Sequence, residues 1–185
     1  MHYLVFGIFP YVALTIMAVG SMARYDRDPF TWKSKSSQIL RKRQFVLGSV
    51  LFHVGVLVIF FGHLVGLLTP SLMFYAVGIP SGSKQVLAVV AGGIAGVVAL
   101  IGGLILLHRR FVDPRIRANS STGDNLVILL LVAQLVLGLA SVVPTLSHLD
   151  GSEMLKFMAW AQGIFTFRTG AAAHIVDVHW IYKLH

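Results

Sequence analysis

The chain has 185 residues, of which 56% are hydrophobic, 12% are charged and none is cysteine. This composition, with a mean hydropathy of +0.80, is typical of a membrane protein and not of a soluble domain. The absence of cysteine excludes disulfides, thiolate-held iron–sulfur clusters and covalently attached c-type haem.

Four apolar stretches are each long enough to cross a bilayer, for which about 20 residues suffice. They run from Tyr3 to Ala23, from Phe45 to Leu68, from Gln85 to His108 and from Asn125 to Pro144. No positive segment precedes the first stretch and Arg24 and Arg27 follow it, so we interpret it as a retained span and not as a secretion signal. The sequence therefore predicts an all-α, polytopic transmembrane helix bundle in a single domain, residues 1–185.

The positive charges that give the chain its net charge of +8 lie mostly in alternate loops. Residues 24–43 hold seven Lys and Arg, and residues 109–117 hold four. The other two polar regions hold Lys84, Lys156, Arg168 and Lys183. The positive-inside rule places the eleven charges in the cytoplasm and the amino terminus outside. The basic balance thus indicates topology, and no nucleic-acid partner is expected.

Small residues recur on one face of the third stretch, at Gly92, Gly96, Ala99 and Gly103. This spacing allows another helix to approach closely, and a groove for a flat cofactor is a compatible second interpretation. After Pro144 the apolar periodicity predicts a helix along the outer membrane surface, residues 154–167.

His53 and His63 lie inside the second apolar stretch, where an ionisable side chain is a functional hypothesis by default. Ten helical residues advance roughly 15 Å and turn about 80° short of three full turns, so the rings project from neighbouring faces in opposite halves of the bilayer. They are too far apart to share one metal ion. Each could ligate its own b haem; hydrogen bonding to neighbouring helices and a proton relay are the alternatives.

A haem held from both sides needs a second ligand opposite each of these rings. His185 is well placed for the outer haem, with His174 and His179 as rivals. For the inner haem no residue fits, because His108 borders Arg109 near the membrane surface.

Several segments, in order along nearly the whole chain, resemble the gamma subunit of membrane-bound respiratory nitrate reductase, a di-haem cytochrome b. They are "LFHVGVLVIFFGHLVGLLTP", "AGGIAGVVALIGGLILLHRR", "PRIRANSSTGDN", "HLDGSEMLKFMAWAQ" and the closing "KLH". The resemblance implies quinol oxidation at the outer face of the prokaryotic cell membrane and two b haems that carry electrons inward. It also implies an iron–sulfur beta subunit and a molybdopterin-containing alpha subunit that reduces nitrate in the cytoplasm.

The resemblance also assigns roles to individual residues. It makes His53 an axial ligand of the proximal haem, and His63 and His185 the axial pair of the distal haem. Lys84 corresponds to a lysine implicated in quinol binding, where its ammonium could donate to a quinone oxygen; a lysine snorkelling to lipid headgroups is the alternative. The quinol could be menaquinol or ubiquinol, since no side-chain pattern separates the two.

The resemblance departs from the family at the carboxyl end. The family continues after "KLH" with a fifth transmembrane helix that carries the second proximal ligand, so we expect this chain to lack its C-terminal helix. Arg115 and Arg117 could pair with propionates of the proximal haem, although ordinary positive-inside charge also accounts for them. The loop with Phe30 and Trp32, together with residues 109–125, is the expected docking surface for the beta subunit.

Two other functions are compatible with the sequence. One is a related di-haem cytochrome b of a sulfur-metabolising or heterodisulfide-reductase-type complex. The other is a haem-free membrane anchor or proton-conducting subunit, which would be colourless.

Overall fold

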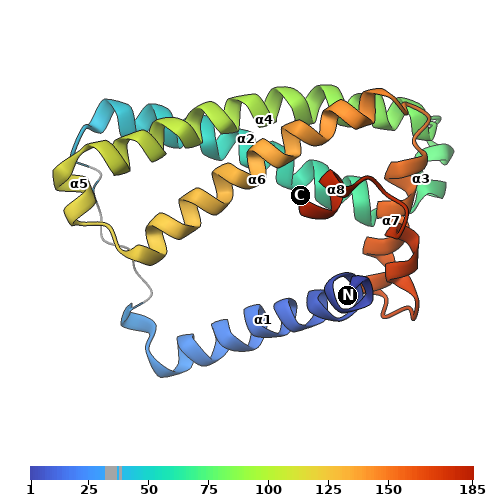
Figure 1. The fold of residues 1–185 in the computed structure, drawn as a ribbon, viewed down its shortest axis with the longest axis horizontal. Helices are drawn as coiled ribbons and strands as arrows, with labels where there is room; N and C mark the ends of the chain where they lie inside the picture. Colours follow the sequence, from blue (N-terminus) through green and yellow to red (C-terminus); the bar gives the residue numbers. More distant parts are fainter. Residues whose placement is uncertain (32–36, 38) are drawn as a thin grey trace.

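Figure 1 traces the fold in a computed structural model, which describes residues 1–31, 37 and 39–185. The long helices are α1 (Phe9–Arg27), α2 (Lys42–Leu68), α4 (Ser81–Val112) and α6 (Thr122–Leu146). The shorter helices are α3 (Ser71–Ala76), α5 (Pro114–Ala118), α7 (Ser152–Phe165) and α8 (Trp180–Leu184). Single helical turns are η1 (Leu4–Ile8), which runs into α1, η2 (Pro29–Thr31) and η3 (Ala171–Ile175). No strand occurs in the described residues, which confirms the all-α prediction.

The four predicted spans are confirmed as helices long and apolar enough to cross a membrane. Each helix continues past its predicted bound at one end or at both. Helical hydrogen bonding extends into polar flanking residues that hydropathy alone leaves out. At the start of α6, Ser121 and Asp124 form a capping box that begins the helix before the apolar stretch. The helix predicted at residues 154–167 is confirmed as α7, displaced by two residues, and its place on the outer membrane surface stays a prediction. The fifth span after His185 and the outside amino terminus stay predictions.

Helices α2, α4 and α6 pack side by side as a three-helix bundle (Figure 1). A Cβ built on Gly55 of α2 would lie 2.6 Å from the Ala95 oxygen and 2.7 Å from the Ala99 Cβ in α4. Gly96 of α4 lies as closely against Leu139 of α6. The small face of α4 therefore serves close helix packing, in the way small residues do in membranes. Gly92 is the exception, with open space above it.

We expect Gly55→Ala to destabilise the protein by about 1–3 kcal/mol, since α2 and α4 must separate to admit the methyl group. Thermal unfolding of the detergent-solubilised protein measures this loss. Gly20→Ala is the matched control, because Gly20 of α1 has no neighbouring atom within 4 Å and alanine favours a helix. Equal unfolding temperatures for the two variants would contradict close α2–α4 packing.

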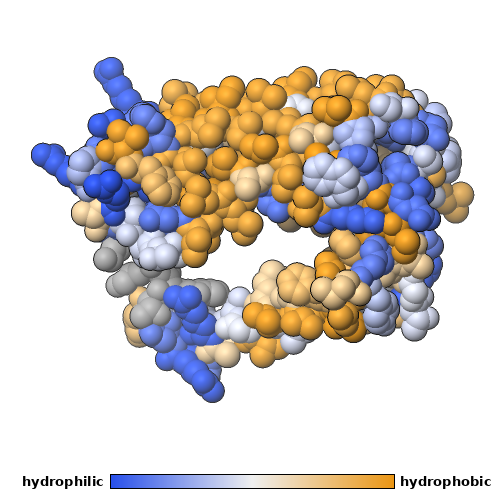
Figure 2. Space-filling view, in the orientation of Figure 1, coloured by the Kyte–Doolittle hydropathy of each residue, from blue (hydrophilic) through white to orange (hydrophobic). Residues whose placement is uncertain are grey.

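Helix α1 lies apart from the bundle, and Figure 2 shows open space between them. It is attached at its amino end, where backbone and side chains contact α7 and η3. The Tyr11 hydroxyl donates to the Ile164 oxygen (3.0 Å), the Trp160 indole to the Phe6 oxygen (2.9 Å), and the His2 ring bonds the Ala172 oxygen (2.8 Å). The first span is therefore positioned by its amino end.

Two side-chain amides, one buried and one half-buried, hold the ends of the bundle helices that lie near α7. Gln162 of α7 donates to the oxygens of Leu67 and Thr69 at the end of α2, at 3.0 and 3.3 Å. Gln85 of α4 donates to the His148 oxygen, just after α6, at 2.6 Å. Helix ends leave carbonyl groups without helical partners, so these amides satisfy groups that the membrane interface would otherwise leave unpaired.

The two ends of the molecule differ in charge. Hydrophobic residues cover the sides of the helices, and hydrophilic residues gather at both ends (Figure 2). The end that holds α5 also holds the carboxyl end of α1 and the amino end of α2, and so collects the eleven Lys and Arg predicted to face the cytoplasm, apart from those in the undescribed residues. The other end holds α3, α7 and α8.

Candidate functional site

The structure brings His63 of α2 and His185, at the end of α8, together. Their ring centroids lie 6.0 Å apart, with an angle of 63° between the ring planes. Two imidazoles bound to one metal ion would have ring centroids about 6 Å apart. This distance is the sum of two nitrogen–metal bonds of about 2 Å each and the distance from each nitrogen to the centre of its ring. The spacing of the pair therefore suits two imidazoles that would hold one metal ion between them.

His63 has one ring nitrogen committed to its own helix. Its Nδ1 lies 2.9 Å from the Ile59 oxygen, and this carbonyl can only accept a hydrogen bond. The proton is therefore assigned to Nδ1, and Nε2 keeps a free lone pair. A metal-ligating histidine usually donates its other N–H in this way, which fixes the ring and its tautomer.

His185 is held at the end of a helical turn and not on a frayed terminus. Its backbone N–H donates to the Ile181 oxygen at 3.0 Å, and Ile181 is buried. The Tyr182 hydroxyl lies 2.8 Å from the Thr145 hydroxyl of α6, which fixes α8 against the bundle. The predicted rivals lie elsewhere: His174 is exposed on η3, and the His179 Nδ1 accepts from the Ile181 N–H at the start of α8.

His53 lies on α2, exposed on the bundle surface. Its Nδ1 lies 2.7 Å from the Ser49 oxygen and 3.2 Å from the Ser49 hydroxyl, so Nε2 is again free to bind a metal. The aromatic ring against it is Phe52, and no imidazole is placed opposite it by the part of the chain that the structure describes. His108 is exposed beside Arg109 at the far end of α4, as expected.

Lys84 is buried at the start of α4, with 7% of its surface exposed, which excludes a side chain that snorkels to headgroups. Its ammonium donates to the Gly66 oxygen of α2 at 2.7 Å and to the Met158 sulfur of α7 at 3.1 Å. The Phe74 ring of α3 faces it at 3.8 Å, close enough for a cation–π contact. An ammonium has three N–H donors, so one remains for a ligand.

A small pocket opens beside Lys84, with Phe74, Tyr75, Met154 and Met158 in its walls. Sequence reasoning missed Phe74 and Met158 as neighbours of the lysine, since nothing in their spacing relates them to it. The signal that does exist is general: an aromatic residue and a soft thioether are common partners of a buried cation. The pocket is small, about 10 Å³, and combines an apolar wall with one cationic donor.

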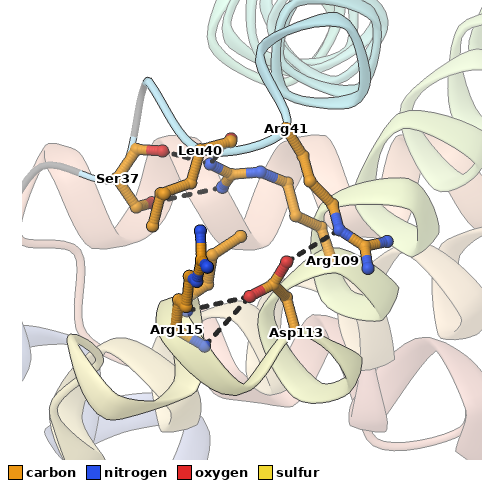
Figure 3. A network of polar contacts seen from close by, with 7 residues as sticks. Ser37, Leu40, Arg41, Arg109, Asp113 and Arg115 are labelled. Carbon is orange, nitrogen blue, oxygen red and sulfur yellow. Dashed lines mark hydrogen bonds and ion pairs between the residues drawn. The ribbon is translucent and has the colours of Figure 1, made fainter.

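The basic end contains a polar network that fixes the connection into α2 (Figure 3). The buried Arg109 guanidinium donates to the oxygens of Leu40, at 2.7 Å, and Ser37. Arg41 pairs with Asp113 at 2.7 Å, and Asp113 also accepts from the Arg115 amide. Partial desolvation raises the pKa of Asp113, but the amide hydrogen bonds and Arg41 outweigh it and hold that pKa below its ordinary value.

The predicted docking surface lies around this network. Phe30 is exposed on η2, and Trp32 lies outside the described residues. Arg115 and Arg117 are both exposed in α5, and neither forms an ion pair with a described residue. This end therefore exposes Arg115 and Arg117, while Arg41 and Arg109 hold the local structure through their bonds to Asp113 and to backbone oxygens.

Known proteins resemble this chain over nearly its whole length. The family described as nitrate reductase gamma subunit matches residues 2–185. The chain is 46% identical over 180 residues to the respiratory nitrate reductase 2 gamma chain of Escherichia coli, which covers 97% of this chain and 79% of that one. It is 36% identical over 169 residues to the nitrate reductase gamma chain of Bacillus subtilis, with 91% and 76% covered.

Proposed function

The chain belongs to the nitrate reductase gamma subunit family, and from this membership we propose that it is the quinol-oxidising cytochrome b subunit of a nitrate reductase complex. It is a multi-pass membrane protein, and we place it in the cell (inner) membrane of a prokaryote with its basic end in the cytoplasm. The observation that carries the proposal is the His63–His185 pair, whose spacing suits trans axial ligation of one haem iron.

Haem bound between these rings would supply a one-electron carrier near the outer face. His63 and His185 would hold the distal haem, and His53, ten residues inward on the same helix, would hold the proximal haem from one side. Roughly 15 Å of helix separates the two histidines along α2. This arrangement supports a path for electrons from the outer end toward the cytoplasmic end.

Lys84 would bind and orient the quinol. When quinol becomes quinone it loses two electrons and two protons, and negative charge develops on its oxygens as the protons leave. The remaining N–H of the Lys84 ammonium can donate to one of these oxygens, and an uncompensated cation stabilises the developing charge. No described carboxylate pairs with Lys84, so its full charge acts on the ligand. Protons released here would leave on the outer side.

The basic end would dock the partner subunits. An iron–sulfur beta subunit is proposed to contact the loop around Phe30 and the α5 region, and a molybdopterin-containing alpha subunit to reduce nitrate beyond it. Free arginines at the rim, including Arg115 and Arg117, would attract an acidic partner surface and speed its association.

The test is an optical difference spectrum, dithionite-reduced minus oxidised, of the protein purified with its complex, together with a haem count per chain. Two b haems that quinol also reduces are the expected result. A colourless, folded protein would overturn the proposal and favour a haem-free anchor.

A further inference from the structure

Gly138 of α6 lies directly against the His185 ring. A Cβ built on Gly138 would meet the ring atoms Cε1, Nε2 and Nδ1 at 2.9, 3.2 and 3.4 Å. The first of these distances is shorter than real Cβ atoms show, so even alanine would force the ring to move. The ring occupies the space that a side chain at this position would fill.

The ring also lies within reach of the Gln134 carbonyl, one turn earlier in α6. A carbonyl oxygen has two lone pairs, so the Gln134 oxygen can serve both the helix and an imidazole N–H. In an α-helix a side chain leans toward the amino terminus and covers the turn before its own Cα. A side chain at position 138 would therefore cover this carbonyl.

We propose that Gly138 is a positioning residue for His185: by lacking a side chain, it admits the imidazole and opens the Gln134 carbonyl to it. This inference rests on the proposed function, in which His63 and His185 ligate one haem. It gives α6, which carries none of the proposed haem ligands, a role in positioning one of them.

The register of α8 supports the same assignment. Tyr182 meets Thr145, seven residues after Gly138 on α6, and seven residues bring a helix back to nearly the same face. The Tyr182–Thr145 hydrogen bond and the Gly138 contact thus hold α8 at two points of one face. The turn cannot slide along α6 without losing one of them.

The test compares Gly138→Ala and Gly138→Val with the unaltered protein, purified with its complex. The readouts are the low-spin haem signals in electron paramagnetic resonance, the two midpoint potentials and the haem count. We expect Gly138→Ala to shift the signal and potential of one haem only. We expect Gly138→Val to lower haem content by about half, because a larger side chain excludes the ring.

Two control variants separate a specific effect from general crowding. Gly96→Ala crowds Leu139, the residue next to Gly138, at 2.8 Å without touching the imidazole, and Gly92→Ala meets no atom within 4 Å. Both should leave the haem signals unchanged. If Gly138→Val keeps both haems unshifted, or if Gly96→Ala causes the same shift as Gly138→Ala, the assignment of Gly138 is wrong while the proposed function stands. If the unaltered protein binds no haem, the proposed function itself fails.

Discussion

His63→Ala is expected to remove about half of the haem from the purified complex and to abolish haem reduction by quinol. The substitution takes away the ring that lies 6.0 Å from the His185 ring, and His185 alone would hold iron from one side only. Because the imidazole is exposed on α2 and its Nδ1 bonds only to its own helix, its loss leaves the α2–α4 packing intact. The protein should therefore fold, with its inner haem retained.

The measurement is a haem count per chain, followed by rapid mixing with a quinol analogue. His174→Ala is the matched control, since His174 is an exposed histidine of the same outer end and should change neither quantity. An unchanged haem content in His63→Ala would show that the His63–His185 pair does not hold a haem.

Lys84→Met is expected to slow haem reduction by quinol about 10- to 100-fold while leaving reduction by dithionite unchanged. The range corresponds to the loss of one charge-assisted hydrogen bond, about 1.5–3 kcal/mol. Methionine has a similar length and places an apolar group between Phe74 and Met158, so the site keeps its packing while it loses its charge and the donor to the Gly66 oxygen. We therefore expect normal expression and normal haem content.

Steady-state kinetics with quinol, and stopped-flow reduction by dithionite, measure the two halves of this prediction. Lys156→Met is the control: Lys156 lies at the same end but pairs with Glu153 at 2.6 Å and is not buried. Equal loss of quinol- and dithionite-driven reduction would indicate a damaged haem site and contradict a role for Lys84 in quinol binding.

The sequence by itself determined the spans and the polarity of the molecule. Hydropathy and the positions of arginine and lysine can be read directly from the sequence. Because burying a charge in lipid is costly, they indicate which segments span the membrane and which loops stay in water. The sequence also showed that His53 and His63 lie at different depths along α2, because the rise between two helical residues follows from their separation in the sequence. The small face of α4 predicted close packing for the same reason, at Gly96, Ala99 and Gly103.

Only the tertiary structure decided which groups meet. The sequence favours His185 over its rivals His174 and His179 as the partner of His63, and the fold of α8 against α6 places the ring of His185 beside His63. Lys84 is buried because α2, α3 and α7 converge on it, which no local pattern encodes. Such contacts join segments separated by tens of residues, and they depend on how helices cross and not on what each helix contains.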